Sequence, residues 1–285
     1  MKKWIIVAES GSDITFEEGR QLGIEIVPMH VTMGEKNYDD GTFPAEKICE
    51  FYDKYKELPK TSGSVPNDFT VLYDRIHAEH PESQILHLAY SASTTISYES
   101  SCAAAADRDY VTAIDTKHVS AGQRAVVLQT LELLKREPEI DREKLLESVR
   151  EICDRTRMSF LPANLIYLHA GGRCSNLELL GSRILKLHPC IEILDGKLVA
   201  TVKYRGSFRK VVKKLIQDCA EKNHLSRERL WLVHAPRFSD ELAQEAEDMA
   251  KELGFKEISW VQTGCVITTH GGPGAFGVVG ISETA

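Results

Sequence analysis

The sequence predicts an α/β fold with two domains. Short apolar runs alternate with segments of helical spacing, which is typical of a doubly wound, mostly parallel sheet with helices on both faces. The 285 residues provide enough chain for two hydrophobic cores. We place an N-terminal α/β domain at residues 1–158 and a C-terminal α/β domain at residues 159–285, and we expect a ligand cleft between them.

The composition is typical of a soluble protein. Hydrophobic residues make up 42% of the chain, and the formal net charge of −7 argues against general nucleic-acid binding. The seven cysteines contain no C-x-x-C pair, so we expect reduced thiols in a cytoplasmic protein and neither a disulfide framework nor a zinc site. No apolar run reaches the roughly twenty residues of a membrane span, and the run after Trp4 is too short for a signal peptide.

The first elements follow from apolar runs and their spacing. After a predicted strand at residues 4–8 comes a polar turn, in which Ser12 or Asp13 is expected to cap a helix that begins near Thr15. The next segments are extended chain at 24–31, broken by Pro28, a polar turn-rich stretch at 32–43 and a helix at 44–55.

A loop rich in hydroxyl groups, residues 60–66, precedes a predicted helix at residues 69–80. One hydroxyl group is enough to cap that helix. Because the loop holds three of them within four residues, Thr61 and Ser62 are candidates to donate hydrogen bonds to a carboxylate or phosphate.

A second hydroxyl-rich loop, residues 91–97, lies between a predicted strand at 84–90 and an Ala-rich helix. Its candidate ligand contacts are Ser91, Ser93 and Thr95. Ligands bind at the carboxyl ends of parallel strands, where helix N-termini also favour anions, so this position predicts an anion site. The domain continues with a strand at 110–114 and helices at 120–135 and 138–157.

The C-terminal domain is predicted from the same alternation. A strand at residues 164–169 leads to two glycines and Arg173, which is a candidate to face the cleft, although a surface arginine after a turn is the simpler interpretation. The later elements are a hairpin turn at 194–198, a strand at 230–234, a helix at 239–253 and a strand at 258–261.

A glycine-rich turn at residues 268–277 follows an apolar run at 265–267 that predicts a strand. The turn is either plain punctuation or a place where backbone N–H groups approach an anion, with His270 and Gly272 as candidate contacts. It spells G-x-G-x-x-G, but no helix with an acidic partner follows, so we exclude a dinucleotide fingerprint.

Residues 203–214 contain six basic residues and no acidic one. A helix from Ser207 would place Arg209 and Lys210 on one broad face. A solvated face is the simplest interpretation of such a run. With Arg205, these residues are also candidates to dock an acidic partner or anionic lipid headgroups.

The inventory of polar groups favours binding over catalysis. The sequence has no Walker loop, no zinc motif and no G-x-S-x-G elbow. The alternative is a stand-alone hydrolase of a small ester or phosphate, with His270 as base and Ser10, Ser91 or Thr95 as nucleophile. A purely structural glycine turn is a more distant alternative.

Several short motifs follow the order and spacing of one known family. They are Ser10 to Asp13, Lys60-Thr61-Ser62, Ser91 to Tyr98, Asp115 to Gly122, Tyr167 to Arg173, His188 to Gly196 and Thr269 to Ala275. Each motif is weak alone. Together they make the chain similar, over essentially its whole length, to the DegV family of bacterial fatty-acid-binding proteins.

The resemblance implies that the chain binds a long-chain fatty acid in a buried tunnel and has no catalytic activity of its own. Thr61 and Thr95 would hold the carboxylate, with His270 and Arg173 nearby, and no cofactor or metal is expected. The family presents that carboxylate to a separate fatty acid kinase for phospholipid synthesis. The basic run with Arg205 falls where the family is thought to meet its kinase or, transiently, an anionic membrane surface.

Three residues depart from the family pattern. Glu9 replaces an aspartate in the first motif, and Thr95 replaces a serine but keeps its hydroxyl group. Ile96 replaces a glycine, and if that position has positive φ, isoleucine would be strained there. We therefore expect a different loop path or a different ligand near Ile96.

Overall fold

A computed structural model describes residues 4–174 and 187–284. Its N-terminal part is built on a parallel sheet of order β2-β1-β6-β7. The register places Ile6 between Ile24 of one neighbouring strand and Leu86 of the other. The strands are β1 (Trp4–Glu9), β2 (Ile24–Val27), β6 (Gln84–Ala89) and β7 (Val111–Asp115).

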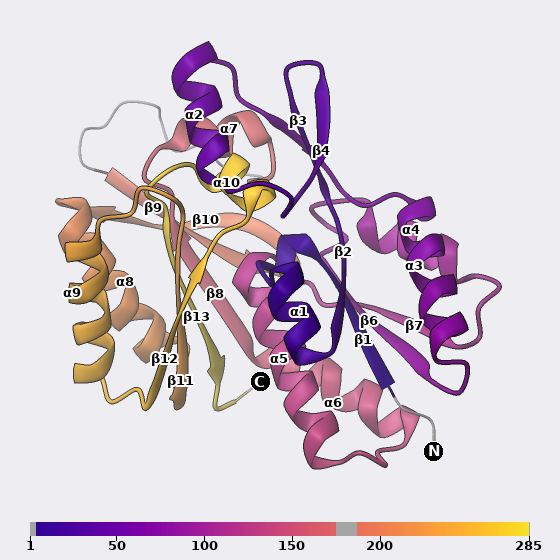
Figure 1. Cartoon of the computed structure of the whole chain (residues 1–285). Helices are drawn as coiled ribbons and strands as arrows, with labels where there is room; N and C mark the ends of the chain where they lie inside the picture. Colours follow the sequence, from indigo (N-terminus) through magenta and orange to yellow (C-terminus); the bar gives the residue numbers. More distant parts are fainter. Residues whose placement is uncertain (1–3, 175–186, 285) are drawn as a thin grey trace.

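Helices cover both faces of this sheet, as Figure 1 shows. Alternate side chains along β1 point to opposite faces, so Ile6 packs in the core under α5 and α6, and Val7 packs in the core under α3 and α4. The helices are α1 (Phe16–Leu22), α3 (Pro66–Glu79), α4 (Ser97–Ala105), α5 (Ser120–Arg136) and α6 (Arg142–Arg155). The predicted doubly wound parallel sheet is confirmed.

A small antiparallel sheet of order β4-β3-β5 extends from this part. It consists of β3 (His30–Met33), β4 (Lys36–Asp39) and β5 (Lys60–Ser62), with α2 (Glu46–Tyr55) before β5. The sequence indicated only a polar, turn-rich stretch and a loop here. Val31 pairs with Tyr38 on one side and with Thr61 on the other, so the first hydroxyl-rich loop begins as an edge strand.

The C-terminal part is a mixed six-stranded sheet of order β10-β9-β8-β13-β11-β12. One face packs against α8 (Phe208–Lys222) and α9 (Asp240–Glu252), and the other face joins a core that includes Met29, Val119 and Ala125 of the N-terminal part. The strands are β8 (Thr156–Leu161), β9 (Leu187–Leu194), β10 (Lys197–Arg205), β11 (Leu225–His234), β12 (Glu257–Gln262) and β13 (Phe276–Ser282).

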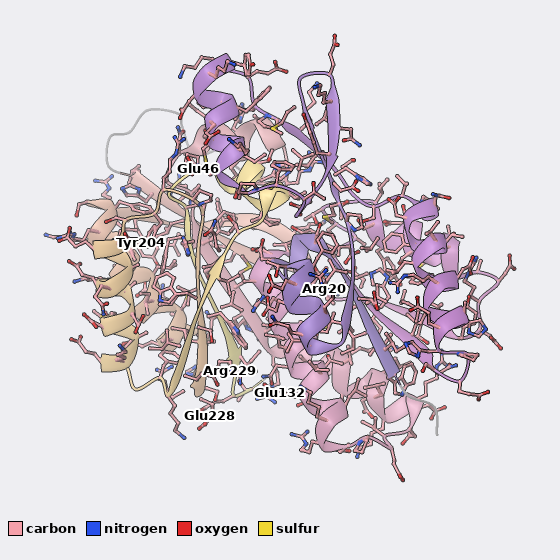
Figure 2. All side chains as sticks on the ribbon, in the orientation of Figure 1. Arg20, Glu46, Glu132, Tyr204, Glu228 and Arg229 are labelled. Carbon is pink, nitrogen blue, oxygen red and sulfur yellow. The ribbon has the colours of Figure 1, made fainter. Side chains whose placement is uncertain are left out.

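The two parts meet along α5 and β8. β8 begins at Thr156, so the division between the sheets lies just before the predicted domain boundary after residue 158. An ion pair of 2.6 Å between Arg229 of β11 and Glu132 of α5 joins the parts at the lower edge, where Figure 2 labels both side chains.

Two short segments that were predicted as strands are helices. They are α7 (Leu165–Gly171) and α10 (Cys265–Gly271), which lie close to α2 at the top of Figure 1. Asn164 caps α7 by accepting a hydrogen bond from the Ile166 N–H at 3.0 Å, and Gly172 ends it with φ of 63°. Apolar runs this short fit a strand and a buried helix equally well, so for α7 the caps were the deciding signal. The helix after β1 is likewise capped by Thr15 and not by Ser12 or Asp13.

Candidate functional site

A pocket lies between the two parts and has an apolar interior. It encloses about 880 Å³ of space between atoms, including space open to solvent at its mouth. The N-terminal part contributes β5 and the segments that follow β2, β6 and β7, and the C-terminal part contributes β8, β10, β11, β13 and α10, so neither part alone forms the pocket. The apolar wall consists of Met29, Tyr90, Val119, Met158, Phe160, Leu168, Leu198, Val233, Ala235, Val266, Ile267, Ala275 and Phe276.

Polar groups that are distant in sequence also line the pocket. Thr61 and Ser62 come from β5, Thr95 from the loop before α4, Arg173 from the turn after α7, and His270 from the last turn of α10. The Thr61 Oγ1 and His270 Nε2 atoms lie 2.7 Å apart, a hydrogen bond across 209 residues of sequence. Ser62 and Arg173 are exposed, so these groups reach the surface of the molecule.

The imidazole of His270 is neutral at physiological pH. Burial, with a smaller contribution from the charge of Arg173, lowers the pKa of His270 to about 4. Its Nδ1 atom has no hydrogen-bond partner among the residues that the structure describes. In the tautomer that protonates Nε2, the imidazole donates to Thr61, and the Thr61 hydroxyl group keeps its own proton for an anion.

Two glycines make room for these side chains. A Cβ atom on Gly171 would lie 2.2 Å from His270 Nδ1, and a Cβ atom on Gly63 would lie 2.1 Å from Thr95 Oγ1. Neither glycine has a positive φ, so the close approach of the two side chains is what requires glycine at each position.

The comparisons with known proteins agree with this architecture. A family model described as "Uncharacterised protein, DegV family" matches residues 3–283. The chain belongs to the DegV family. It is 29% identical over 272 residues to a DegV domain-containing protein of Lactococcus lactis, a match that covers 94% of this chain and 96% of that one.

Solved structures of the DegV family share the fold. A fatty-acid-binding DegV family protein from Thermus thermophilus superimposes with a TM-score of 0.87 at 24% identity and covers 98% of this chain and 99% of its own. A DegV family protein from Eubacterium eligens, loaded with heptadecanoic acid, has a TM-score of 0.83 at 19% identity, with 98% and 100% coverage.

Four residues that were predicted as ligand contacts do not line the pocket of this DegV protein. Ser10 is buried and donates to Asp40 Oδ2 at 2.8 Å, and Ser91 donates to the Gly196 carbonyl oxygen at 2.7 Å. Ser93 is exposed beside the same hairpin turn. Gly272 has φ of 75° and packs against the ring of Tyr167, so its role is to end α10.

Ser91 instead connects the two parts, because Gly196 belongs to the β9–β10 turn of the second sheet. Lys117 reinforces that contact with an ion pair of 2.6 Å to Asp195 of the same turn. The wall residues that sequence patterns did not reveal, such as Met29 and Leu198, are ordinary core types whose position depends on how the parts meet. Two others did carry a signal: Ser120, the first residue of α5, and Thr94, in the second hydroxyl-rich loop.

The substitution of Ile96 causes no backbone strain. Ile96 has φ of −81° and ψ of 0°, a conformation open to any residue, and its side chain is 57% exposed. Thr95 keeps its hydroxyl group at the pocket. The condition for strain at Ile96, a positive φ, is therefore not met, and a different ligand near Ile96 stays a prediction.

Some of the basic residues at 203–214 form ion pairs within the protein and others do not. Arg209 of α8 forms ion pairs with Glu241 at 2.6 Å and Glu245 at 3.3 Å, both on α9, so it braces two helices of its own domain. Arg205 and Lys210 are exposed and have no ion pair in the described part of the chain. Across residues 4–174 and 187–284 there is no helix that could cross a membrane and no cluster of metal ligands.

Proposed function

We propose that this protein binds one long-chain fatty acid in the pocket and holds its carboxylate with Thr61, Thr95 and His270. The main support is an apolar pocket whose wall contains the hydrogen bond of 2.7 Å between Thr61 Oγ1 and His270 Nε2. Arg173 adds positive charge beside that pair. The DegV relatives that bind fatty acids support this assignment.

The energetics are consistent with an acyl chain. Burying about fifteen methylene groups at about 0.8 kcal/mol each provides roughly 12 kcal/mol of gross driving force. A carboxylate that entered the pocket unpaired would cancel much of that gain. The hydroxyl groups of Thr61 and Thr95 supply donors at the place where a carboxylate needs them.

The same geometry suits a carrier that presents the carboxylate to a separate kinase. Ser62 and Arg173 are exposed, so a carboxylate near Thr61 lies close to solvent, where a second protein carrying ATP can reach it. The proposed docking groups are Arg205 and Lys210, whose charges are not neutralised by described neighbours, with Arg209 beside them. An anionic membrane surface is a weaker, transient partner for the same face.

Native mass spectrometry of the freshly purified protein, with lipid extraction of the same sample, tests the binding step. One stoichiometric fatty acid is the expected result. A clean unliganded mass, with no uptake of added palmitate or oleate, would refute the assignment. Formation of an acyl phosphate only when a fatty acid kinase and ATP are added would establish the carrier role, and Arg205→Glu should slow it.

The hydrogen bond between Thr61 and His270 also favours one alternative, a hydrolase with Thr61 as nucleophile. Ser10 and Ser91, which were predicted for that role, bond elsewhere. The lowered pKa of His270 makes it a weak base, and no described acid orients its Nδ1 atom. Turnover of p-nitrophenyl esters that is abolished by His270→Ala would support this alternative.

A further inference from the structure

Two buried aspartates from the N-terminal part meet the beginning of α10. Asp13 follows the short 3-10 turn η1 (Ser10–Ser12), and Asp40 follows β4. They are 6% and 1% exposed, and both come within 3.6 Å of where a Cβ atom on Gly264 would lie. Two carboxyl groups are thus gathered at one end of a helix from the other half of the chain.

These aspartates accept hydrogen bonds from the first N–H groups of α10. Asp13 Oδ1 accepts from the Gly264 N–H at 2.7 Å, and Asp40 Oδ1 accepts from the N–H groups of Cys265 at 2.9 Å and Val266 at 3.3 Å. Such N–H groups have no partner within their own helix. The contacts join segments more than two hundred residues apart, because Asp13 and Gly264 differ by 251 positions.

The second oxygen of each aspartate leads to the opposite wall of the pocket. Asp13 Oδ2 accepts from the Ser120 hydroxyl group at 2.5 Å, and Ser120 lines the pocket. Asp40 Oδ2 accepts from Ser10, which in turn accepts from the N–H of Met29, another wall residue, at 2.9 Å. Each carboxyl group therefore connects the α10 wall with the wall that faces it.

We propose that Asp13 and Asp40 are positioning residues that fasten α10 to the N-terminal part, and that release of this contact opens the pocket and sets the rate of ligand exchange. An acyl chain held between two walls must lose its contacts with both of them before it leaves through the mouth of the pocket, and separation of the walls speeds that loss. α10 carries Val266, Ile267 and His270 of the wall, so its attachment decides that separation. The proposal rests on the proposed function for the identity of the ligand.

The charges around the pair make this contact sensitive to pH. Burial, together with the charge of Asp40, raises the pKa of Asp13 to about 7, and burial also raises the pKa of Asp40. The remaining neighbours are Ser10, Ser120, Arg124, Cys265 and Tyr90. Burial raises the pKa of the Cys265 thiol to about 12 and that of Tyr90 well above its usual value, so neither ionises near neutral pH.

The direction of the pH effect follows from that raised pKa. Asp13 holds its proton more tightly when α10 is attached than when it is detached, so the attachment is strongest below the ordinary pKa of aspartate and weakens as the pH rises through about 7. Asp13 then ionises in a buried place next to Asp40. Fatty-acid release should accelerate by roughly tenfold from pH 6 to pH 8, because linkage to one proton changes the equilibrium by about a factor of ten per pH unit only below the pKa of about 7 and levels off above it.

The experiment measures release of a fluorescent long-chain fatty acid from the full chain to excess albumin at pH 6, 7 and 8. Asp13→Asn keeps an acceptor oxygen and tolerates the local φ of 58°, but cannot ionise, so release should be slow and independent of pH. Asp40→Ala removes the acceptor of two N–H groups and should speed release by about 10- to 100-fold at every pH. Asp107→Asn, an exposed position outside both walls, should follow the wild-type profile.

Hydrogen exchange of the amides of residues 264–266 in the unliganded chain separates the two proposals. It should be faster at pH 8 than the intrinsic pH dependence allows, and Asp13→Asn should remove that excess. This readout holds even if the chain takes up no fatty acid, a result that would refute the proposed function alone. A wild-type pH profile in Asp13→Asn, for release or for exchange, would overturn the positioning role.

Discussion

The two ends of α10 are satisfied in opposite ways. At its beginning, buried carboxylates occupy the free N–H groups of the helix, and every described contact there is made within the protein. At its end, His270 is neutral, one of its ring nitrogens has no described partner, and its other nitrogen meets the Thr61 hydroxyl group at the pocket. The first end attaches the helix to the rest of the protein. The second is the ligand-binding end, because only it keeps hydrogen-bonding capacity for another molecule.

The largest effect in this comparison is expected at Thr61. Thr61→Val keeps the shape of the side chain but removes the hydroxyl group that we assign to the carboxylate. Since a hydrogen bond to a charged group contributes about 1.5–3 kcal/mol, fatty-acid affinity should fall by roughly 10- to 100-fold in a fluorescence displacement assay.

Thr269→Val is the matched control for that variant. Thr269 lies on α10 beside His270, but its hydroxyl group donates to the Cys265 carbonyl oxygen at 2.8 Å and it does not line the pocket. The same chemical change should cost at most about 1 kcal/mol of folding stability and leave the dissociation constant unchanged. Equal losses of affinity in the two variants would remove the distinction between the ends of the helix.

The order of elements could be predicted from the sequence because it depends on local periodicity. The parallel sheet with helices on both faces and the β9–β10 hairpin follow from spacing and turn residues. α10 could not be predicted in this way, because its first N–H groups are capped by Asp13 and Asp40 from the other half of the chain. A cap that is distant in sequence leaves no local mark.

The site was predicted in part for the same reason. Family motifs pointed to Thr61, Thr95 and His270, and all three line the pocket. Hydroxyl density alone could not separate Thr61 from Ser91, since the partner of Ser91 is the Gly196 carbonyl oxygen of the second sheet. Which hydroxyl group stays free for a ligand depends on how the two parts pack against each other.

An intermediate effect is expected at Gly171, which lies against the His270 ring at the ligand-binding end of α10. In Gly171→Ala the added methyl group collides with the His270 ring, and overpacking of this kind costs about 1–3 kcal/mol of stability. The displaced ring should also weaken fatty-acid binding. In the His270→Ala background the space is free, and alanine is favoured over glycine in a helix by about 0.5–1 kcal/mol, so the same change should be neutral or stabilising. Urea unfolding of the four proteins of this cycle measures the coupling, and additive losses would show that Gly171 does not position the ring.

The smallest effect is expected at Ile96, which immediately follows the pocket residue Thr95. Isoleucine at this position raises the question of whether the larger residue alters the site, but Ile96 has φ of −81°, its side chain is exposed, and it does not line the pocket. Ile96→Gly should therefore change the unfolding free energy by at most about 0.5 kcal/mol, as surface substitutions usually do. It should leave fatty-acid affinity and the preferred chain length unchanged when a series of saturated acids is compared by displacement. A shift in preferred chain length would instead mean that Ile96 contacts the ligand, and the binding site would then include more than the Thr61, Thr95 and His270 side chains.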